Sequence, residues 1–211
     1  MSELKVNKVT PRSGTTVTLG DSGDTIALGS GAAFGAISGS SIALSGNIGI
    51  GGATPTASGT GITFPATQSA STNANTLDDY EEGTWTPTYV ASTTDFTSIT
   101  YQAQNGTYTK IGRLVIVNVT MSTNSITAGA AAGEVYIDGL PFTPIQNGSN
   151  GTVLYGATNW AGDNPDGWTT FGNTRGYLFY RTSTTFSSIN PADLGTGGSA
   201  NNYFATLTYF V

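Results

Sequence analysis

Apolar and polar residues alternate over the second half of the chain in a pattern typical of β-strands. From Trp85 onward, short apolar runs are separated by turn residues, and no long segment has the 3.6-residue period of a helix. Strands are expected at 99–103, 107–111, 114–121, 135–137, 153–155, 177–180 and 204–211. Seven or eight short strands of this kind predict an antiparallel, jelly-roll-like β-sandwich over residues 84–211.

Two turns and one strand give this prediction detail. Asn105-Gly106 is the strongest short hairpin signal, and Gly112-Arg113 predicts a turn before the long apolar run that starts at Leu114. Alternation in the last strand puts one set of residues on one face and two phenylalanines on the other: Ala205, Leu207, Tyr209 and Val211 against Phe204 and Phe210.

The first half of the chain has a different pattern. Apolar residues recur as pairs two positions apart, between Gly-rich turns: Val17/Leu19, Ile26/Leu28, Ile42/Leu44, Ile48/Ile50 and Ile62/Phe64. Such short strands cannot build a core alone, so they need stacked neighbours, either along one chain as a solenoid or from identical chains. The irregular spacing favours the second route, an intertwined trimeric β stalk over 25–76. Parts of 51–75 also fit a flexible Gly/Ser linker.

An acidic segment at 77–83 separates the two halves. Its acids are Asp78, Asp79, Glu81 and Glu82, whereas the 53 residues from Thr25 to Leu77 carry no charge. Thr76 as N-cap and Gly83 as a stop predict one short helical turn at this joint. In a trimer the four carboxylates of each chain either point into solvent or, pointing inward, require a cation or arginine partners.

Residues 1–24 have a local surplus of positive charge. Lys5, Lys8 and Arg12 are three of the seven basic residues, and Val6 and Val9 lie between them. Charges on an edge strand hinder aggregation, so a solvated edge strand is one interpretation. The other is an arm that docks on a larger assembly by adding to a sheet or groove. A basic segment in an acidic chain favours docking through Lys5, Val6, Lys8, Val9 and Arg12.

Composition excludes several classes of function. The chain has no cysteine and no histidine, which removes disulfides, thiolate nucleophiles, the Ser-His-Asp triad and most transition-metal sites. A net charge of −6 argues against binding nucleic acid. No apolar run approaches the ~18 residues of a membrane span, and the start lacks the apolar core of a signal peptide. We therefore expect a protein made in a cytoplasm, without membrane insertion, cofactor or metal site.

One segment of the second half has residues suited to carbohydrate. Trp160 and Trp168 flank a turn that contains Asp163, Asn164 and Asp166. Indole faces stack on sugars while carboxylates and amides bind the hydroxyls, so these five residues are the candidate glycan site. The alternative is an Asx/Pro turn with both indoles packed on the sandwich. A calcium loop is a weaker interpretation, because the EF-hand spacing is incomplete.

Several segments together resemble tail-fibre-like virion proteins of marine bacteriophages. The resemblance rests on the stretches from Lys5 to Asp24, Asn75 to Pro87, Gly106 to Val115 and Ile137 to Phe142. It implies a homotrimeric virion fibre whose N-terminus docks on other tail or capsid proteins and whose C-terminal head binds a host-surface glycan or another receptor, protein included. Residues 143–198 resemble no family, and they contain the loops expected at the receptor-binding tip, Asn147–Gly151 and Trp160–Trp168.

Two alternatives stay open from the sequence. The fibre could decorate the capsid or neck rather than the tail. An enzyme of the tailspike class could cleave glycans with two carboxylates, for which Glu134 with Asp138, or Asp163 with Asp166, would be candidates. Depolymerising tailspikes usually carry a much longer parallel β-helix, so we expect a protein that is not an enzyme. Arg175 and Arg181 are either surface charges or receptor contacts.

Overall fold

The computed structural model describes residues 46–211 except 56–57, 69–70, 146–151 and 171–173, and for 152–155 and 167–170 it describes the backbone alone. The arm at 1–24, with Lys5, Val6, Lys8, Val9 and Arg12, and the first part of the expected stalk lie outside the described residues.

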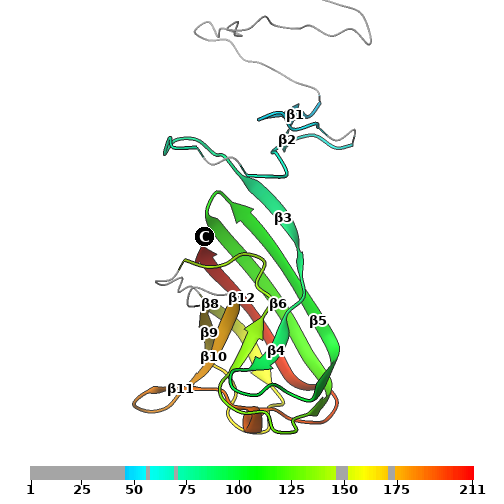
Figure 1. Cartoon of the computed structure of the whole chain (residues 1–211), viewed down its shortest axis with the longest axis vertical. Coiled ribbons are helices and arrows are strands. Elements are labelled where there is room, and N and C mark those ends of the chain that lie inside the picture. The colour runs from blue at the N-terminus through cyan, green and yellow to red at the C-terminus, as the bar shows by residue number, and fades with distance from the viewer. Residues whose placement is uncertain (1–45, 56–57, 69–70, 146–151, 171–173) are drawn as a thin grey trace, which may run out of the picture. The chain divides into compact units, whose positions relative to one another are not determined.

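Two antiparallel sheets make up most of the described chain (Figure 1). The first has the order β3-β5-β6-β12-β8, and the second has the order β11-β10-β7-β4, with β9 also paired to β10. The first sheet consists of β3 (Tyr80–Trp85), β5 (Ser98–Ile111), β6 (Leu114–Thr127), β12 (Ala200–Phe210) and β8 (Thr152–Thr158). The second consists of β11 (Phe186–Ser188), β10 (Arg175–Arg181), β7 (Val135–Asp138), β4 (Thr88–Ala91) and β9 (Gly167–Thr170).

The all-β class expected from the sequence is confirmed. The described residues contain no α-helix, and their one helical element is the 3₁₀ turn η1 (Pro191–Asp193). Accordingly, no helix in this part of the chain is long and apolar enough to cross a membrane.

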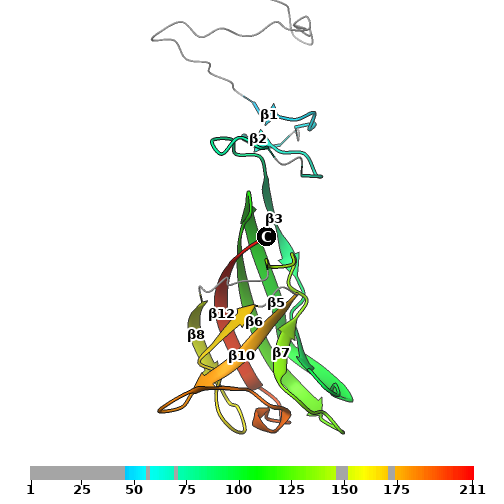
Figure 2. The same cartoon turned by 60° about the vertical axis from the view of Figure 1, so that its left-hand side comes forward.

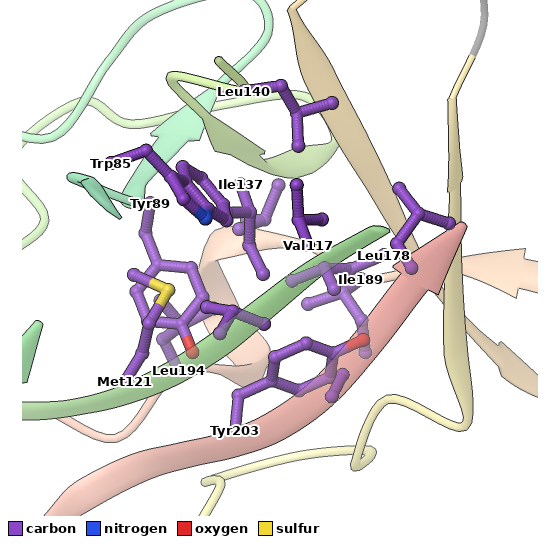
Figure 3. Packing of buried hydrophobic residues seen from close by; sticks show 14 of the residues in the cluster. Trp85, Tyr89, Val117, Met121, Ile137, Leu140, Leu178, Ile189, Leu194 and Tyr203 are labelled. Atoms are coloured by element: carbon purple, nitrogen blue, oxygen red, sulfur yellow. The ribbon is translucent and has the colours of Figure 1, made fainter. Parts of the chain in front are cut away.

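The core lies between the two sheets, which face each other (Figure 2). Val117 and Met121 from the first sheet are fully buried together with Ile137 from the second (Figure 3). Burial of each such side chain contributes about 1.5–3 kcal/mol. The alternation predicted for the last strand is confirmed, because Ala205, Leu207 and Tyr209 are buried whereas Phe204 and Phe210 are exposed.

The longest pairing in the fold is the hairpin of β5 and β6. Ile111 pairs with Leu114 across the two-residue turn of Gly112 and Arg113, as predicted. Gly112 has φ +54° at the first turn position, where a type II′ turn requires positive φ and favours glycine.

The hairpin predicted at Asn105-Gly106 is wrong. Both residues lie inside β5, where Gly106 pairs with Trp85 of β3 on one side and Val119 of β6 on the other. A Cβ atom at position 106 would overlap the indole of Trp85. Glycine is therefore needed here for close packing of an aromatic ring and not for a turn.

The helical turn predicted for the acidic joint is also wrong. Residues 80–85 form the edge strand β3, whose register with β5 runs from Tyr80 opposite Ile111 to Trp85 opposite Gly106. Gly83 does not stop a helix; the ring of its cross-strand partner Tyr108 occupies the space where a Cβ would lie. Ladder pairing with β5 outweighs the local capping signals.

The described part of the expected stalk forms little regular structure. Its strands β1 (Ile48–Gly49) and β2 (Ile62–Thr63) pair in parallel over two residues each. Three of the four apolar side chains that recur at two-residue spacing here stay exposed: Ile48 by 37%, Ile50 by 36% and Ile62 by 56%. The fourth, Phe64, is half-buried, and its ring centre lies 6.4 Å from that of Tyr80. This segment thus leaves three of these four side chains uncovered within one chain.

Candidate functional site

A cluster of loops gathers at the end of the sandwich that carries η1, the single short coil at the bottom of Figure 1. We call residues 159–166, 181–186 and 190–195 the loop cluster. The N–H groups of Ala161 and Gly162 donate to the carbonyl of Asp193 at 2.8 and 3.1 Å, which ties the first segment to the third. A Cβ at Gly162 would overlap the Asp193 carboxylate, so this contact requires glycine.

Trp160 belongs to the core and not to an exposed face. Its side chain is 9% exposed, its ring packs edge-on against Tyr89 at 5.7 Å, and its Nε1–H donates to the carbonyl of Asn202 at 3.1 Å. The expectation that Trp160 stacks on a sugar is therefore corrected. Its indole is buried against the sandwich, which is the alternative that the sequence left open for this residue. The backbone of Trp168 lies in β9 opposite Leu178, and its side chain lies outside the described residues.

The polar residues of the same segment are exposed, as a binding site requires. Asp163, Asn164 and Asp166 all lie on the surface. Asp166 is also held in place, because its N–H donates to the carbonyl of Phe179 at 2.8 Å and its carboxylate accepts from the N–H of Arg181 at 2.6 Å. These bonds join residues 159–166 to the hairpin that leaves β10.

That hairpin, between β10 and β11, presents the most accessible large aromatic ring of the described residues. Phe186 is 62% exposed, and the Arg181 guanidinium lies 5.3 Å from the centre of its ring. Phe179 supports the ring edge-on at 5.2 Å. The Arg181 side chain has no carboxylate partner among the described residues, so its charge stays available to a ligand.

The four residues between Arg181 and Phe186 form the turn of the hairpin, which Thr182 and Thr185 close. The Thr182 hydroxyl accepts from the N–H of Thr185 at 2.9 Å, and the Thr182 N–H donates to the Thr185 carbonyl at 2.8 Å. Residues 181–186 line a shallow pocket of about 260 Å³. The pocket combines an aromatic ring, a cation and hydroxyl groups.

These groups suit a saccharide. A ring face stacks on the apolar side of a sugar, a guanidinium binds carboxylate or hydroxyl oxygens, and the Asp166 carboxylate accepts from hydroxyls. Sequence reasoning named Arg181 without deciding its role and missed Phe186. The signal that could have found the hairpin is the polar run from Thr182 to Thr185 between a cation and an aromatic residue.

Arg175, the other arginine left open, is engaged within the fold. Its Nε is 3.3 Å from the Asp138 carboxylate, and its guanidinium lies 5.4 Å from the ring centre of Tyr136. Both partners lie on β7, the neighbouring strand. Arg175 therefore links β10 to β7.

Each carboxylate of the acidic segment has a partner inside the chain. Asp79 is 5% exposed and forms a buried ion pair with Lys110, whose Nζ also donates to the Gln68 side chain at 3.3 Å. Asp79 therefore differs from the expectation that these carboxylates face solvent or need a cation or arginine from other chains, because Lys110 of β5 in the same chain is its partner. The Asp78 carboxylate accepts from the N–H of Ser71 at 2.6 Å. Tyrosine hydroxyls donate to the other two, Tyr108 to Glu81 and Tyr80 to Glu82.

The carboxylates considered for catalysis or metal binding have the following surroundings. Glu134 accepts from the Ser188 hydroxyl at 2.6 Å, and Asp138 accepts from Arg175. The described part of the chain contains no cluster of three acidic, histidine or cysteine side chains able to hold a metal ion.

Comparison with known proteins adds no family. No protein-family model matches the chain, and no curated protein matches it significantly. The functional argument therefore rests on the residues themselves.

Proposed function

We propose that the protein is a structural fibre of a bacteriophage virion, a homotrimer that docks to the particle by its N-terminus and binds a host-surface glycan through its C-terminal sandwich. The loop cluster, with Arg181, Phe186 and Asp166, is the proposed receptor site. This replaces the site centred on Trp160 and keeps the exposed Asp163 and Asn164 as neighbours of the contact.

The single observation that carries the proposal is the uncovered apolar surface of the segment that precedes the sandwich. Ile48, Ile50 and Ile62 are exposed within one chain, in a segment whose strands are two residues long. Side chains of this kind gain about 1.5–3 kcal/mol each when they are fully buried. Three identical chains wound together supply the neighbours that one chain lacks, and this is the construction of a fibre stalk.

The two ends of the sandwich support the assignment of roles. At one end β3 begins at Tyr80, beside the Gly112 turn, and Phe210 pairs with Leu114 next to that turn. At the other end β12 begins at Ala200, close to Gly195 of the loop cluster. The 11 residues of β12 separate these ends, and a strand of that length spans about 35 Å. The entering chain therefore leaves the loop cluster free to contact a receptor.

The enzyme alternative has weaker support. A glycosidase needs one carboxylic acid and one carboxylate directed at the same bond. The Glu134 and Asp138 side chains bind Ser188 and Arg175, and Asp166 binds backbone N–H of Arg181. In these contacts the three carboxylates accept hydrogen bonds that link neighbouring strands and loops, which is a structural role and not a catalytic one.

Labelling of intact phage particles tests the proposal. Antibodies raised against the full chain should label fibres in electron micrographs, and the purified chain should compete with particles for adsorption to host cells. Labelling at the capsid or neck would favour the decoration-fibre alternative. Absence of label on intact particles would contradict a virion role. Release of reducing ends from host polysaccharide would favour the tailspike enzyme.

A further inference from the structure

The outer face of the first sheet has an apolar row that crosses four strands. Tyr80 of β3 pairs with Ile111 of β5, Ile111 pairs with Leu114 of β6, and Leu114 pairs with Phe210 of β12. Direct cross-strand partners have Cβ atoms about 4.5–5.5 Å apart, so the four side chains are continuous. We call these four residues the apolar row.

The apolar row is accessible in a single chain. Tyr80 is 41% exposed, Ile111 44% and Phe210 38%. Ile116, on the same face two residues further along β6 than Leu114, is half-buried. Contiguous exposed apolar patches on soluble proteins usually mark interaction sites.

The same face carries almost no charge. Among the residues that point outward from the paired parts of β3, β5, β6 and β12, Glu82 is the single charged one. These outward residues are Tyr80, Glu82, Thr84, Asn105, Thr107, Thr109, Ile111, Leu114, Ile116, Asn118, Thr120, Phe204, Thr206, Thr208 and Phe210. Depletion of charge is the compositional mark of the core of an interface. It also suits contact between identical surfaces, in which like charges would otherwise meet.

Two opposite charges flank the apolar row. Glu82 is exposed on β3, at one end of the row. At the other end the Arg113 guanidinium lies 5.4 Å from the ring centre of Phe210. When copies associate head-to-tail in a ring, the acidic end of one row meets the basic end of the next, and a closed ring satisfies every copy equally. A twofold pairing of antiparallel rows would join the same two opposite charges, so the closed ring follows from the proposed trimer and the charges supply the complementarity.

We propose that the apolar row is the surface by which the sandwich of one chain packs against the sandwiches of identical chains, head-to-tail around a closed ring. The occupant is a second copy of this chain. The inference rests on the proposed trimer and extends it, because the stalk alone could hold three chains together while the heads stay apart.

Thiol labelling tests this surface, since the chain contains no cysteine and a single introduced thiol reports on one position. Ile111→Cys places the thiol in the apolar row, and Ser183→Cys places a matched thiol in the exposed hairpin of the loop cluster. Each full-chain variant is treated with iodoacetamide under native conditions and in urea, and its mass is measured by light scattering. We expect the thiol at 111 to react at least tenfold more slowly than the thiol at 183 in native protein, and equally fast in urea.

The outcomes separate this inference from the proposed function. A trimeric mass with similar native rates at 111 and 183 would overturn the role of the apolar row and leave the trimeric fibre standing. A monomeric mass for the unmodified chain would overturn the trimer and this inference together. A trimer that is lost in Ile111→Cys but kept in Ser183→Cys would support the apolar row as the contact.

Discussion

Trp85 covers Gly106, its direct cross-strand neighbour, so closely that a Cβ atom at position 106 would enter the indole ring. Tyr108 covers Gly83 in the same way two pairs further along the two strands. Rings that cover glycines on the partner strand fix the register of β3 against β5. The edge strand that leads into the sandwich is thus held by shape as well as by hydrogen bonds.

Gly106→Ala should destabilise the protein by about 1–3 kcal/mol, because the added methyl group forces Trp85 out of its position. Gly156→Ala is the matched control, since Gly156 also lies in a strand of the first sheet and a Cβ there meets nothing within 4 Å. Urea unfolding of the two variants measures the difference. Equal stabilities would contradict the close packing of Trp85 on Gly106.

Lys110→Met should cost about 3–5 kcal/mol, because it leaves the buried carboxylate of Asp79 without its cation. Changing both partners, Asp79→Leu with Lys110→Met, should recover most of this loss by replacing the ion pair with apolar contacts. Unfolding free energies of both single variants and the double variant give the coupling. Additive losses would show that the two side chains do not depend on each other.

Stability should fall in alkaline solution. Burial raises the pKa of Tyr101 to about 12, and the hydrogen bond to the Glu81 carboxylate raises the pKa of Tyr108 to about 12. Unfolded tyrosine has a pKa of about 10, so between these values the folded chain binds more protons than the unfolded chain. The stabilisation is fully present below pH ~10 and is lost as pH rises through ~12.

Thermal unfolding between pH 8 and 12 measures this dependence. The melting temperature should be nearly constant up to about pH 10 and fall above it. Tyr108→Phe should weaken the dependence, since one of the contributing groups is removed. A melting temperature that stays level up to pH 12 would show that the phenols are not protected in the folded state.

Two aromatic substitutions distinguish the core from the receptor site. Trp160→Ala should destabilise the protein by about 3–5 kcal/mol, because it empties a buried position and leaves the Asn202 carbonyl without its donor. Phe186→Ala should leave stability within about 0.5–1 kcal/mol, because the ring is 62% exposed. Melting curves of the two proteins provide the comparison.

Adsorption to host cells provides the functional half of the same test. Phe186→Ala and Arg181→Ala should each weaken binding about fivefold or more, the equivalent of about 1 kcal/mol. Ser98→Ala, at an exposed position of β5 outside the loop cluster, serves as the control and should leave adsorption unchanged. Unchanged adsorption by folded Phe186→Ala protein would move the receptor site away from the hairpin.

The strand pattern of the second half was readable from sequence because alternation in a half-buried strand follows directly from the side-chain period of two. Ala205, Leu207 and Tyr209 are buried for this reason. Glycine was harder to interpret. Gly106 and Gly83 carry turn and cap signals, yet both serve to admit an aromatic ring from the neighbouring strand.

The candidate site was only partly predictable. Asp166 and Arg181 were recognised as polar residues of interest, but their hydrogen bond joins positions 15 residues apart. Trp160 is buried by elements that pack over it, whereas Phe186 is exposed. The residues next to each of them in the sequence do not reveal this difference. The partner of Asp79 is 31 residues away on β5, beyond the reach of any local pattern.

The measurement that tests the central claim most directly is the mass of the full chain in solution. Light scattering at micromolar concentration should give three times the chain mass of 21.6 kDa, about 65 kDa, because in the proposed trimer the exposed Ile48, Ile50 and Ile62 are covered by the other chains. A mass of 21.6 kDa, with a folded β spectrum, would contradict the trimeric fibre.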